Sequence, residues 1–185
     1  MFEPTRILRD EHDVILQGLE ILEACSEKLE AGEKVSPDTL DSLIEFFRLY
    51  ADKTHHGKEE ALLFPAMIEK GFSRETGPIH CMLADHEQNR ALTKKMVQAA
   101  AELRAGDQTA ALRFAEAAGD YVHVLREHIQ KENMVLFNMA EQVLSAEEPA
   151  LLAKFHDVDK NQIGQAEIAR LKNILTEVQE AVPAV

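Results

Sequence analysis

Cysteine and aromatic residues are scarce in this chain. Its 185 residues include two cysteines, Cys25 and Cys81, which lie far apart and form no CxxC pair. That count excludes a disulfide framework and a cysteine-rich zinc or iron–sulfur site, so we interpret both as small core residues. Tryptophan is absent and aromatic residues make up 5% of the chain, so the aromatic-rich pattern typical of strands is missing.

Positive charge and long apolar runs are also lacking. The chain has 20 Lys+Arg against 33 Asp+Glu, a net charge of −13, and phosphate backbones and anionic lipid surfaces repel such a chain. Nucleic acid and membranes are therefore not expected as partners. No apolar run approaches the roughly 20 residues that span a bilayer, and the first residues show no signal-peptide pattern. We expect a cytoplasmic protein.

Glycine and proline are few and lie at the boundaries of helical patterns. The chain has eight glycines and six prolines, and Ser36-Pro37 and Gly77-Pro78 are typical helix starts. Apolar residues between these points recur at three- and four-residue steps. We expect four long helices, at about residues 5–30, 37–70, 77–106 and 107–144, with Pro65 kinking or interrupting the second.

Four long helices with short connections predict an all-α fold, an antiparallel up-down-up-down four-helix bundle. We expect this domain over residues 1–145. Residues 146–185 should form a C-terminal helical extension outside the bundle, with one helix ending near residue 157 and another at about 165–181. A capping box at Ser145–Glu148 is expected to begin it.

A weak internal repeat draws attention to the bundle interior. The segment His55-His56-Gly57-Lys58-Glu59 recurs as His128-Ile129-Gln130-Lys131-Glu132, each followed by Leu-Phe at the same distance. Upstream, Glu11-His12-Asp13 recurs as Asp85-His86-Glu87. Each half of the chain therefore combines a helix carrying one acid-flanked histidine with a helix carrying His-x-x-Lys-Glu.

Helical spacing indicates which of these side chains face the core. His12 interrupts the apolar stripe of its helix, and His55 and His128 have apolar residues at helical steps on both sides. His86 has them on one side. A glutamate four residues after a core-facing histidine lies one turn along the same face. The inward set is His12, His55, Glu59, His86, His128 and Glu132.

Two interpretations of this set compete. A lone inward histidine is usually a hydrogen-bonded core residue, and a His–Glu pair is usually a surface ion pair. Here four imidazoles and two carboxylates would share one interior, where unpaired carboxylates are expensive to bury. Cations remove that difficulty, because carboxylates and neutral imidazoles become ligands. The set therefore predicts two metal ions, with two histidines per ion and both glutamates bridging.

The remaining histidines are interpreted as structural or surface residues: His56, His80, His123 and His156. His56 has charged residues along its helix face. His56 and Glu60 are nevertheless also four residues apart, so this pair stays open as an alternative to His55 and Glu59. Three acids beside the histidines could order them by hydrogen bonding, although surface acids are the simpler interpretation: Asp13, Asp85 and Glu87.

Imidazole and carboxylate without thiolate suit iron, manganese or zinc. Four protein ligands per ion would leave room for an oxygen bridge and an exchangeable ligand. Such an open site suits iron, whereas zinc usually settles at four ligands. The chain contains neither Glu-x-x-His, the motif of ferritin-like di-metal bundles, nor the HExxH of zinc proteases.

These motifs, over about residues 5–145, resemble the haemerythrin-like (HHE cation-binding) domain family, and its bacterial four-His, two-Glu subgroup in particular. The resemblance implies a four-helix bundle around a non-haem di-iron centre with an oxo or hydroxo bridge. By motif position it implies as ligands His12, His55, Glu59, His86, His128 and Glu132.

The chain departs from the oxygen-carrying haemerythrins at two positions. Met82 stands where the third helix of those proteins has a further histidine, and Asn133 where their fourth helix has an aspartate. Losing a fifth histidine should open the coordination of both irons. That favours reaction with O2, peroxide or nitric oxide over reversible oxygen carriage.

The sequence therefore predicts a di-iron protein that binds or reacts with a small oxidant, in sensing or detoxification, with an electron-donor protein as a further partner. The alternative is iron buffering, delivery or redox sensing without turnover, so enzymatic activity is left open. A metal-free helical interaction protein ranks last, because it leaves the recurrence of ligand-type residues unexplained.

Overall fold

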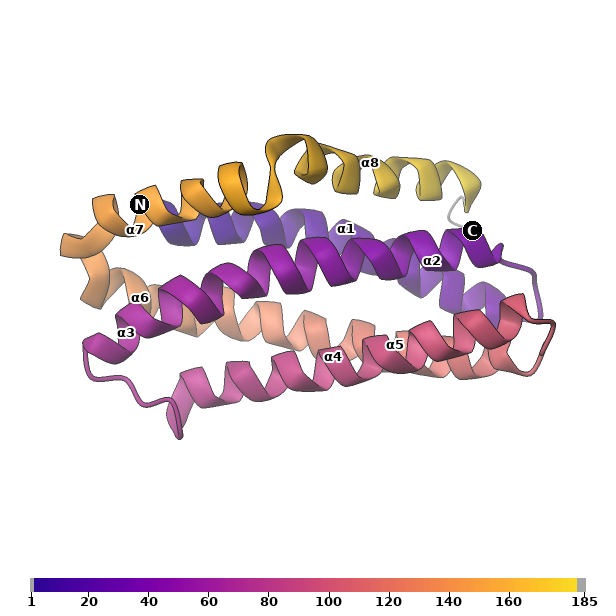
Figure 1. Cartoon of the computed structure of the whole chain (residues 1–185). Coiled ribbons are helices and arrows are strands. Elements are labelled where there is room, and N and C mark those ends of the chain that lie inside the picture. Colours follow the sequence, from indigo (N-terminus) through magenta and orange to yellow (C-terminus); the bar gives the residue numbers. More distant parts are fainter. Residues whose placement is uncertain (1, 183–185) are drawn as a thin grey trace.

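The computed structural model describes residues 2–182, except for the side chain of Gln162. Within that range the chain is helical and forms no strand, as predicted. Figure 1 shows long helical rods lying side by side, with the two C-terminal helices laid along one side of them. None of the helices among these residues combines the length and the apolar composition needed to cross a bilayer.

The first two rods come from the N-terminal part of the chain. The first is α1 (Glu3–Glu30), and the second begins as α2 (Pro37–Phe46), whose first turn is capped by the Ser36 side chain as expected. The second rod then passes through two π-helical segments into a short α-helix: η1 (Phe47–His56), η2 (Glu59–Leu63) and α3 (Phe64–Glu69). Pro65 lies in the first turn of α3, so the predicted interruption coincides with this change of helix type.

The other two rods complete the bundle. The third is α4 (Gly77–Arg104). The fourth contains α5 (Ala110–Lys131), the π-helical η3 (Glu132–Leu136) and α6 (Phe137–Leu144). Both π-helical interruptions nearest the centre, η2 and η3, begin at a glutamate of the predicted site. Wide π turns of this kind are frequent at functional sites.

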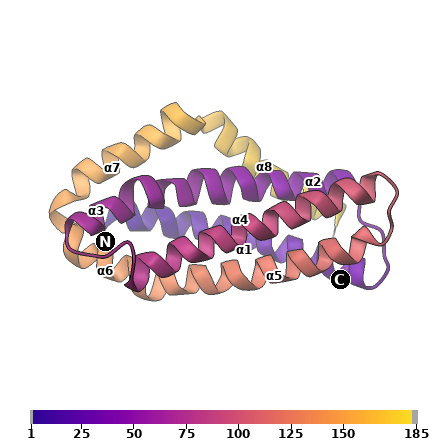
Figure 2. The ribbon, with the colours of Figure 1, turned by 60° about the horizontal axis from the view of Figure 1, so that its bottom comes forward.

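The C-terminal extension packs outside the bundle, as predicted. After the short η4 (Ser145–Glu147), it contains α7 (Glu148–Asp157), η5 (Val158–Ile163) and α8 (Gln165–Ala181). Figure 2 shows α7 and α8 joined in an arch beside the bundle, and they contact α1 and the second rod. Gly164, at φ 93°, makes the turn between η5 and α8.

The predicted capping box at Ser145–Glu148 is wrong. Neither side chain caps a helix there. The Glu148 carboxylate instead accepts a hydrogen bond from the backbone N–H of Glu3, with Oε1 2.8 Å from the nitrogen. Glu148 therefore ties the start of α7 to the first turn of α1, whose N–H groups lack partners within the helix.

Two apolar clusters fill the bundle, and a polar layer separates them. Along α1, Leu8 belongs to one cluster and Ile15 to the other, with His12 between them. Along the fourth rod, Ile129 and Leu136 divide in the same way around Glu132. The polar side chains are thus closed off from both ends of the bundle by apolar packing.

Candidate metal centre

Every residue of the predicted site points into this polar layer, and each of the four rods contributes. The set contains His12 on α1, His55 and Glu59 on the second rod, His86 on α4, and His128 and Glu132 on the fourth rod. Each side chain is at most 1% exposed. The structure therefore brings together all six residues picked by helical spacing.

The two carboxylates lie between imidazoles of different rods. One oxygen of Glu59 is 3.6 Å from His55 Nε2, and the other is 3.5 Å from His86 Nε2. Glu132 Oε2 is 3.2 Å from His12 Nε2 and 3.3 Å from His128 Nε2. Each carboxylate therefore faces imidazoles from two different rods.

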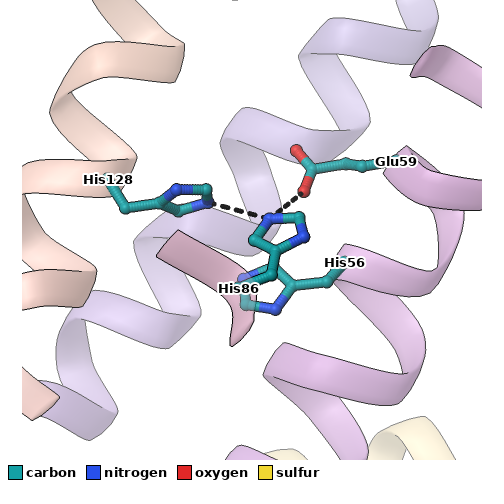
Figure 3. A group of neighbouring side chains, drawn as sticks. All are labelled: His56, Glu59, His86 and His128. Carbon is teal, nitrogen blue, oxygen red and sulfur yellow. Dashed lines mark hydrogen bonds and ion pairs between the residues drawn. The ribbon is translucent and has the colours of Figure 1, made fainter. Parts of the chain in front are cut away.

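A fifth histidine joins them. His56 was expected on a solvated face, and this was wrong: its side chain is 1% exposed. Its ring stacks on that of His86, with centroids 3.9 Å apart and an angle of 16° between the planes. Figure 3 shows the two stacked rings, with Glu59 and His128 directed toward the same space.

The π-helical segment η1 explains the error. A π turn closes one residue later than an α turn, so side chains that α-helical spacing sends outward rotate toward the core. His55 and His56 then both face inward, although they are adjacent. The signal in the sequence was the doubled pair His55-His56 and Glu59-Glu60, and α-helical spacing allowed only one member of each to be chosen.

The donor atoms gather into two groups that share Glu59. His56, Glu59, His86 and His128 form one group, and His12, His55, Glu59 and Glu132 form the other. Within each group the atoms lie within 4.8 Å of one another. Two ions with a common bridging carboxylate would fit this arrangement, but with three and two histidines instead of the two and two expected.

The outward-facing nitrogen of four of the five imidazoles meets an oxygen. His12, His55, His86 and His128 place Nδ1 3.0, 3.0, 2.7 and 3.4 Å from oxygens of Asn133, Glu11, Glu60 and Asp85. His56 Nδ1 lies 3.6 Å from Asp52 Oδ1, beyond hydrogen-bond distance, and has no hydrogen-bond partner among the described residues. An oxygen at Nδ1 favours the tautomer with its proton there, which leaves Nε2 free as a ligand atom.

The preferred interpretation of the three acids beside the histidines was that they are surface residues. It holds for Asp13 and Glu87, which are exposed, but was wrong for Asp85, which contacts His128. The other oxygen partners were missed because they reach the histidines across the bundle from neighbouring rods. Glu60, the rejected half of the second His–Glu pair, is one of these outer partners, since it accepts from His86.

Many of the inward-facing atoms have no hydrogen-bond partner among the described residues. These are both oxygens of Glu59 and of Glu132, and Nε2 of His12, His55 and His56. Buried polar atoms are normally paired, because leaving them unpaired is costly. Here the unpaired atoms are all acceptors or potential lone-pair donors facing one space. A pair of cations fits this donor set.

The pKa values of the buried side chains also favour bound cations. Burial and the charge of Glu132 raise the pKa of Glu59 well above its ordinary value. Burial, with neighbouring imidazoles, lowers the pKa of His56 to about 3. Burial also opposes the charge on His128, yet Glu132 and Asp85 outweigh it and raise the pKa of that imidazole to about 9. Bound cations would replace this conflict by holding both carboxylates ionised and the imidazoles neutral.

Lys58 is a further residue that sequence reasoning passed over. Its side chain is fully buried, and Nζ bonds to the Glu11 carboxylate and lies 2.8 Å from Asp159 Oδ1 on η5. Nζ also lies 5.9 Å from the centre of the Phe155 ring on α7. Through His55, Glu11 and Lys58, the centre is connected to the C-terminal extension.

The remaining histidines and the two cysteines lie outside the centre. His80, His123 and His156 are exposed, as predicted. Cys25 is buried, as predicted, but Cys81 is exposed, so its assignment to the core was wrong. Cys81 lies near the start of α4 between two residues that face the core, Ile79 and Met82, on the helix face they leave to solvent.

Comparison with known proteins agrees with this geometry. An uncharacterized protein of Mycobacterium tuberculosis and one of Mycobacterium bovis are each 23% identical over 180 residues, which cover 97% of this chain and 69% of theirs. No solved structure gives a significant match. The profile described as the Hemerythrin HHE cation binding domain matches residues 3–140, which span all four rods and the whole His/Glu set. The chain belongs to the hemerythrin HHE cation-binding domain family.

Proposed function

We propose that the chain holds two iron ions and that this centre binds or reacts with a small oxidant: O2, nitric oxide or peroxide. The proposed ligands are His12, His55, Glu59, His86, His128 and Glu132, now joined by His56. The observation that carries the proposal is the set of unpaired donor atoms facing one buried space.

Iron is preferred over the other metals on the donor set. Imidazole and carboxylate without thiolate are compatible with iron, manganese and zinc. Seven donor residues with a shared carboxylate give four protein ligands per ion, which would complete a four-coordinate zinc site but leave open positions on a six-coordinate iron. Two ferrous ions can supply two electrons to a small oxidant, which is the chemistry that the metal pair would bring.

The chain itself would supply positioning and a dry environment. The oxygens at Nδ1 hold four of the five imidazoles with Nε2 inward, and a carboxylate there makes the imidazole a stronger ligand. Glu59, present in both donor groups, would fix the spacing of the two ions. The apolar clusters on either side exclude bulk water from the centre.

The burial of the ligand side chains distinguishes between the two alternative functions without turnover, iron delivery and redox sensing. Iron delivery requires release of the ion, yet the ligand side chains are at most 1% exposed and are held from outside by a further layer of contacts. That arrangement favours a retained cofactor over a delivered cargo. Redox sensing remains the second candidate, since it needs the same retained centre but no repeated reaction.

The compartment follows from the same chemistry. The structure has two free thiols, Cys25 and Cys81, one of them exposed. Ferrous iron and an exposed thiol both persist best where conditions are reducing. We therefore place the protein in the cytoplasm, with an electron-donor protein returning the centre to its reduced state.

Metal analysis and gas titration test the proposal. The purified protein should contain about two irons per chain by plasma mass spectrometry. Anaerobically reduced protein should change its visible spectrum on adding O2, nitric oxide or peroxide, while a zinc-loaded sample should not. Repeated consumption of the oxidant with excess reductant indicates detoxification, and one equivalent per centre indicates sensing. Protein that takes up no iron under reducing conditions would refute the proposal.

A further inference from the structure

A cavity lies directly outside His56. It has a volume of about 460 Å³ and lies between the second rod and α4, with Tyr121 of α5 contributing to its wall. His56 is among its lining residues and also contributes to a metal-ion donor group. The cavity therefore shares an imidazole with the centre.

Asn89 gives this cavity an unused recognition group. It lies on α4, lines the cavity and is 2% exposed. Neither its amide nitrogen nor its amide oxygen has a hydrogen-bond partner among the described residues. A buried amide without partners is costly, so a ligand that offers it an acceptor or a donor would recover that energy.

Three cations and two carboxylates, Asp52 and Glu87, line the cavity, and two of the cations have no ion-pair partner among the described residues. Arg48 and Lys94 line it, are exposed, and form no ion pair with any residue in the described part of the chain. The third cation, Arg90, is engaged by Asp52, Glu60 and Glu87. Two uncommitted cations at one opening are notable in a chain of net charge −13.

We propose that this cavity binds a small organic anion, with its carboxylate or phosphate group at Arg48 and Lys94 and a polar group on the Asn89 amide. The volume is in the range of pockets that take metabolite-sized ligands, and is larger than a simple inorganic ion requires. Ala91, Val97 and the Tyr121 ring provide apolar wall for the body of such a ligand.

Binding of an anion in the cavity would affect the metal pair. This effect on the metal pair rests on the proposed function. Asp52 lines the cavity and lies 3.6 Å from His56 Nδ1. An anion that binds Arg90, the hydrogen-bond partner of Asp52, would displace the carboxylate that lies beside His56. Its binding should therefore shift the visible spectrum of the iron-loaded protein.

Benzoate and phenyl phosphate serve as probes, with benzamide as the uncharged analogue of benzoate. Isothermal titration calorimetry on metal-free and iron-loaded protein should detect binding of both anions and weaker binding of benzamide. Arg48→Gln with Lys94→Gln should weaken benzoate binding by about tenfold or more. 4-Hydroxybenzoate, whose hydroxyl offers the Asn89 amide a partner, should bind more tightly than benzoate, and Asn89→Leu should remove that gain. Lys95→Gln is the matched control, because this neighbour on α4 lines a different cavity.

Three results would overturn the proposal. They are no binding of either anion at millimolar concentration, equal affinity in the double variant and in Lys95→Gln, or inorganic phosphate binding as tightly as phenyl phosphate. The double variant replaces exposed residues, so circular dichroism should show unchanged folding. Binding to metal-free protein does not depend on iron, so failure of the di-iron proposal would remove the spectral shift and leave the calorimetry intact.

Discussion

The two halves of the bundle build their part of the centre from equivalent contacts. In the first half, His55 Nδ1 meets Glu11, which in turn binds Lys58. In the second half, His128 Nδ1 meets Asp85, which in turn binds Lys131. These are equivalent positions of the sequence repeat. The repeat therefore encodes a ligand frame together with the contacts that orient it.

The halves differ at three positions outside that frame. His56 of the first half corresponds to Ile129 of the second, which is an apolar core residue. Lys58 is sealed beneath the C-terminal extension, whereas Lys131 is partly exposed. Glu60, which holds His86, corresponds to Asn133, which holds His12. Duplication accounts for the symmetric frame, and these differences make the two proposed ion positions unequal.

The largest effect is expected from the two carboxylates of the centre. Glu59 belongs to both donor groups and Glu132 to one. Glu59→Gln should therefore abolish binding of both ions, whereas Glu132→Gln should leave about one iron per chain, as measured by plasma mass spectrometry. Glu127→Gln, an exposed change on α5, is the control. Equal losses in the two variants would contradict the unequal sharing.

The equivalent lysines should differ next. Lys58→Met leaves the buried Glu11 facing Asp159 without the cation between them, which should cost about 3–5 kcal/mol of unfolding free energy. Lys131→Met removes a partly exposed pair and should cost less than about 1 kcal/mol. Urea denaturation of the metal-free variants measures both. Similar losses would mean that the C-terminal extension does not seal this side.

His56→Ile makes the first half resemble the second. One imidazole leaves the three-histidine group, so one of the two ions should bind about 100-fold more weakly while the other is retained. Competition with an iron chelator gives the two affinities. His123→Ile, at an exposed position on α5, should leave both unchanged. Unchanged affinities in His56→Ile would remove this residue from the ligand set.

His56 also shows where sequence reasoning reaches its limit. Apolar spacing predicted the four rods and six inward residues, because most of each rod is α-helical and keeps its phase. Apolar spacing gave a wrong prediction where η1 departs from α-helical geometry, because apolar periodicity does not specify whether a turn is α-helical or π-helical. With His56, the donor set contains five histidines. The open coordination of the metal pair can therefore no longer be inferred from the lack of a fifth histidine.

The outer contacts could not be predicted for a different reason. Lys58 and Asp159 are 101 residues apart, and His12 and Asn133 are 121 apart. Such pairs depend on how rods and extension pack, which local patterns do not specify. Asp85 could be named as a candidate from the sequence because it precedes a site histidine in the repeat. Its partner in the structure is His128, from the neighbouring rod.

The pH dependence of the metal-free protein offers a smaller test of the same asymmetry. Burial lowers the pKa of His56 from its ordinary 6.5 to about 3. Between those values the unfolded chain binds a proton that the folded chain does not, so stability falls as the pH falls. His56→Ile should reduce this slope by up to about 1.4 kcal/mol per pH unit between about pH 6 and 4. Urea denaturation at several pH values measures it, and an unchanged slope would contradict the burial of His56.

The smallest effect is expected at the third difference. Asn133 Oδ1 lies 3.0 Å from His12 Nδ1 and also accepts from Arg9. Asn133→Asp would give His12 a carboxylate partner like those of the other histidines, which makes the imidazole a stronger ligand and stabilises the oxidised ion more than the reduced one. The reduction potential of the centre should fall, while iron affinity changes by less than about tenfold. Asn138→Asp is the matched control, since Asn138 also binds Arg9 but contacts no histidine among the described residues. An equal change of the reduction potential in both variants would show that the effect arises from Arg9, and it would contradict the proposed role of His12.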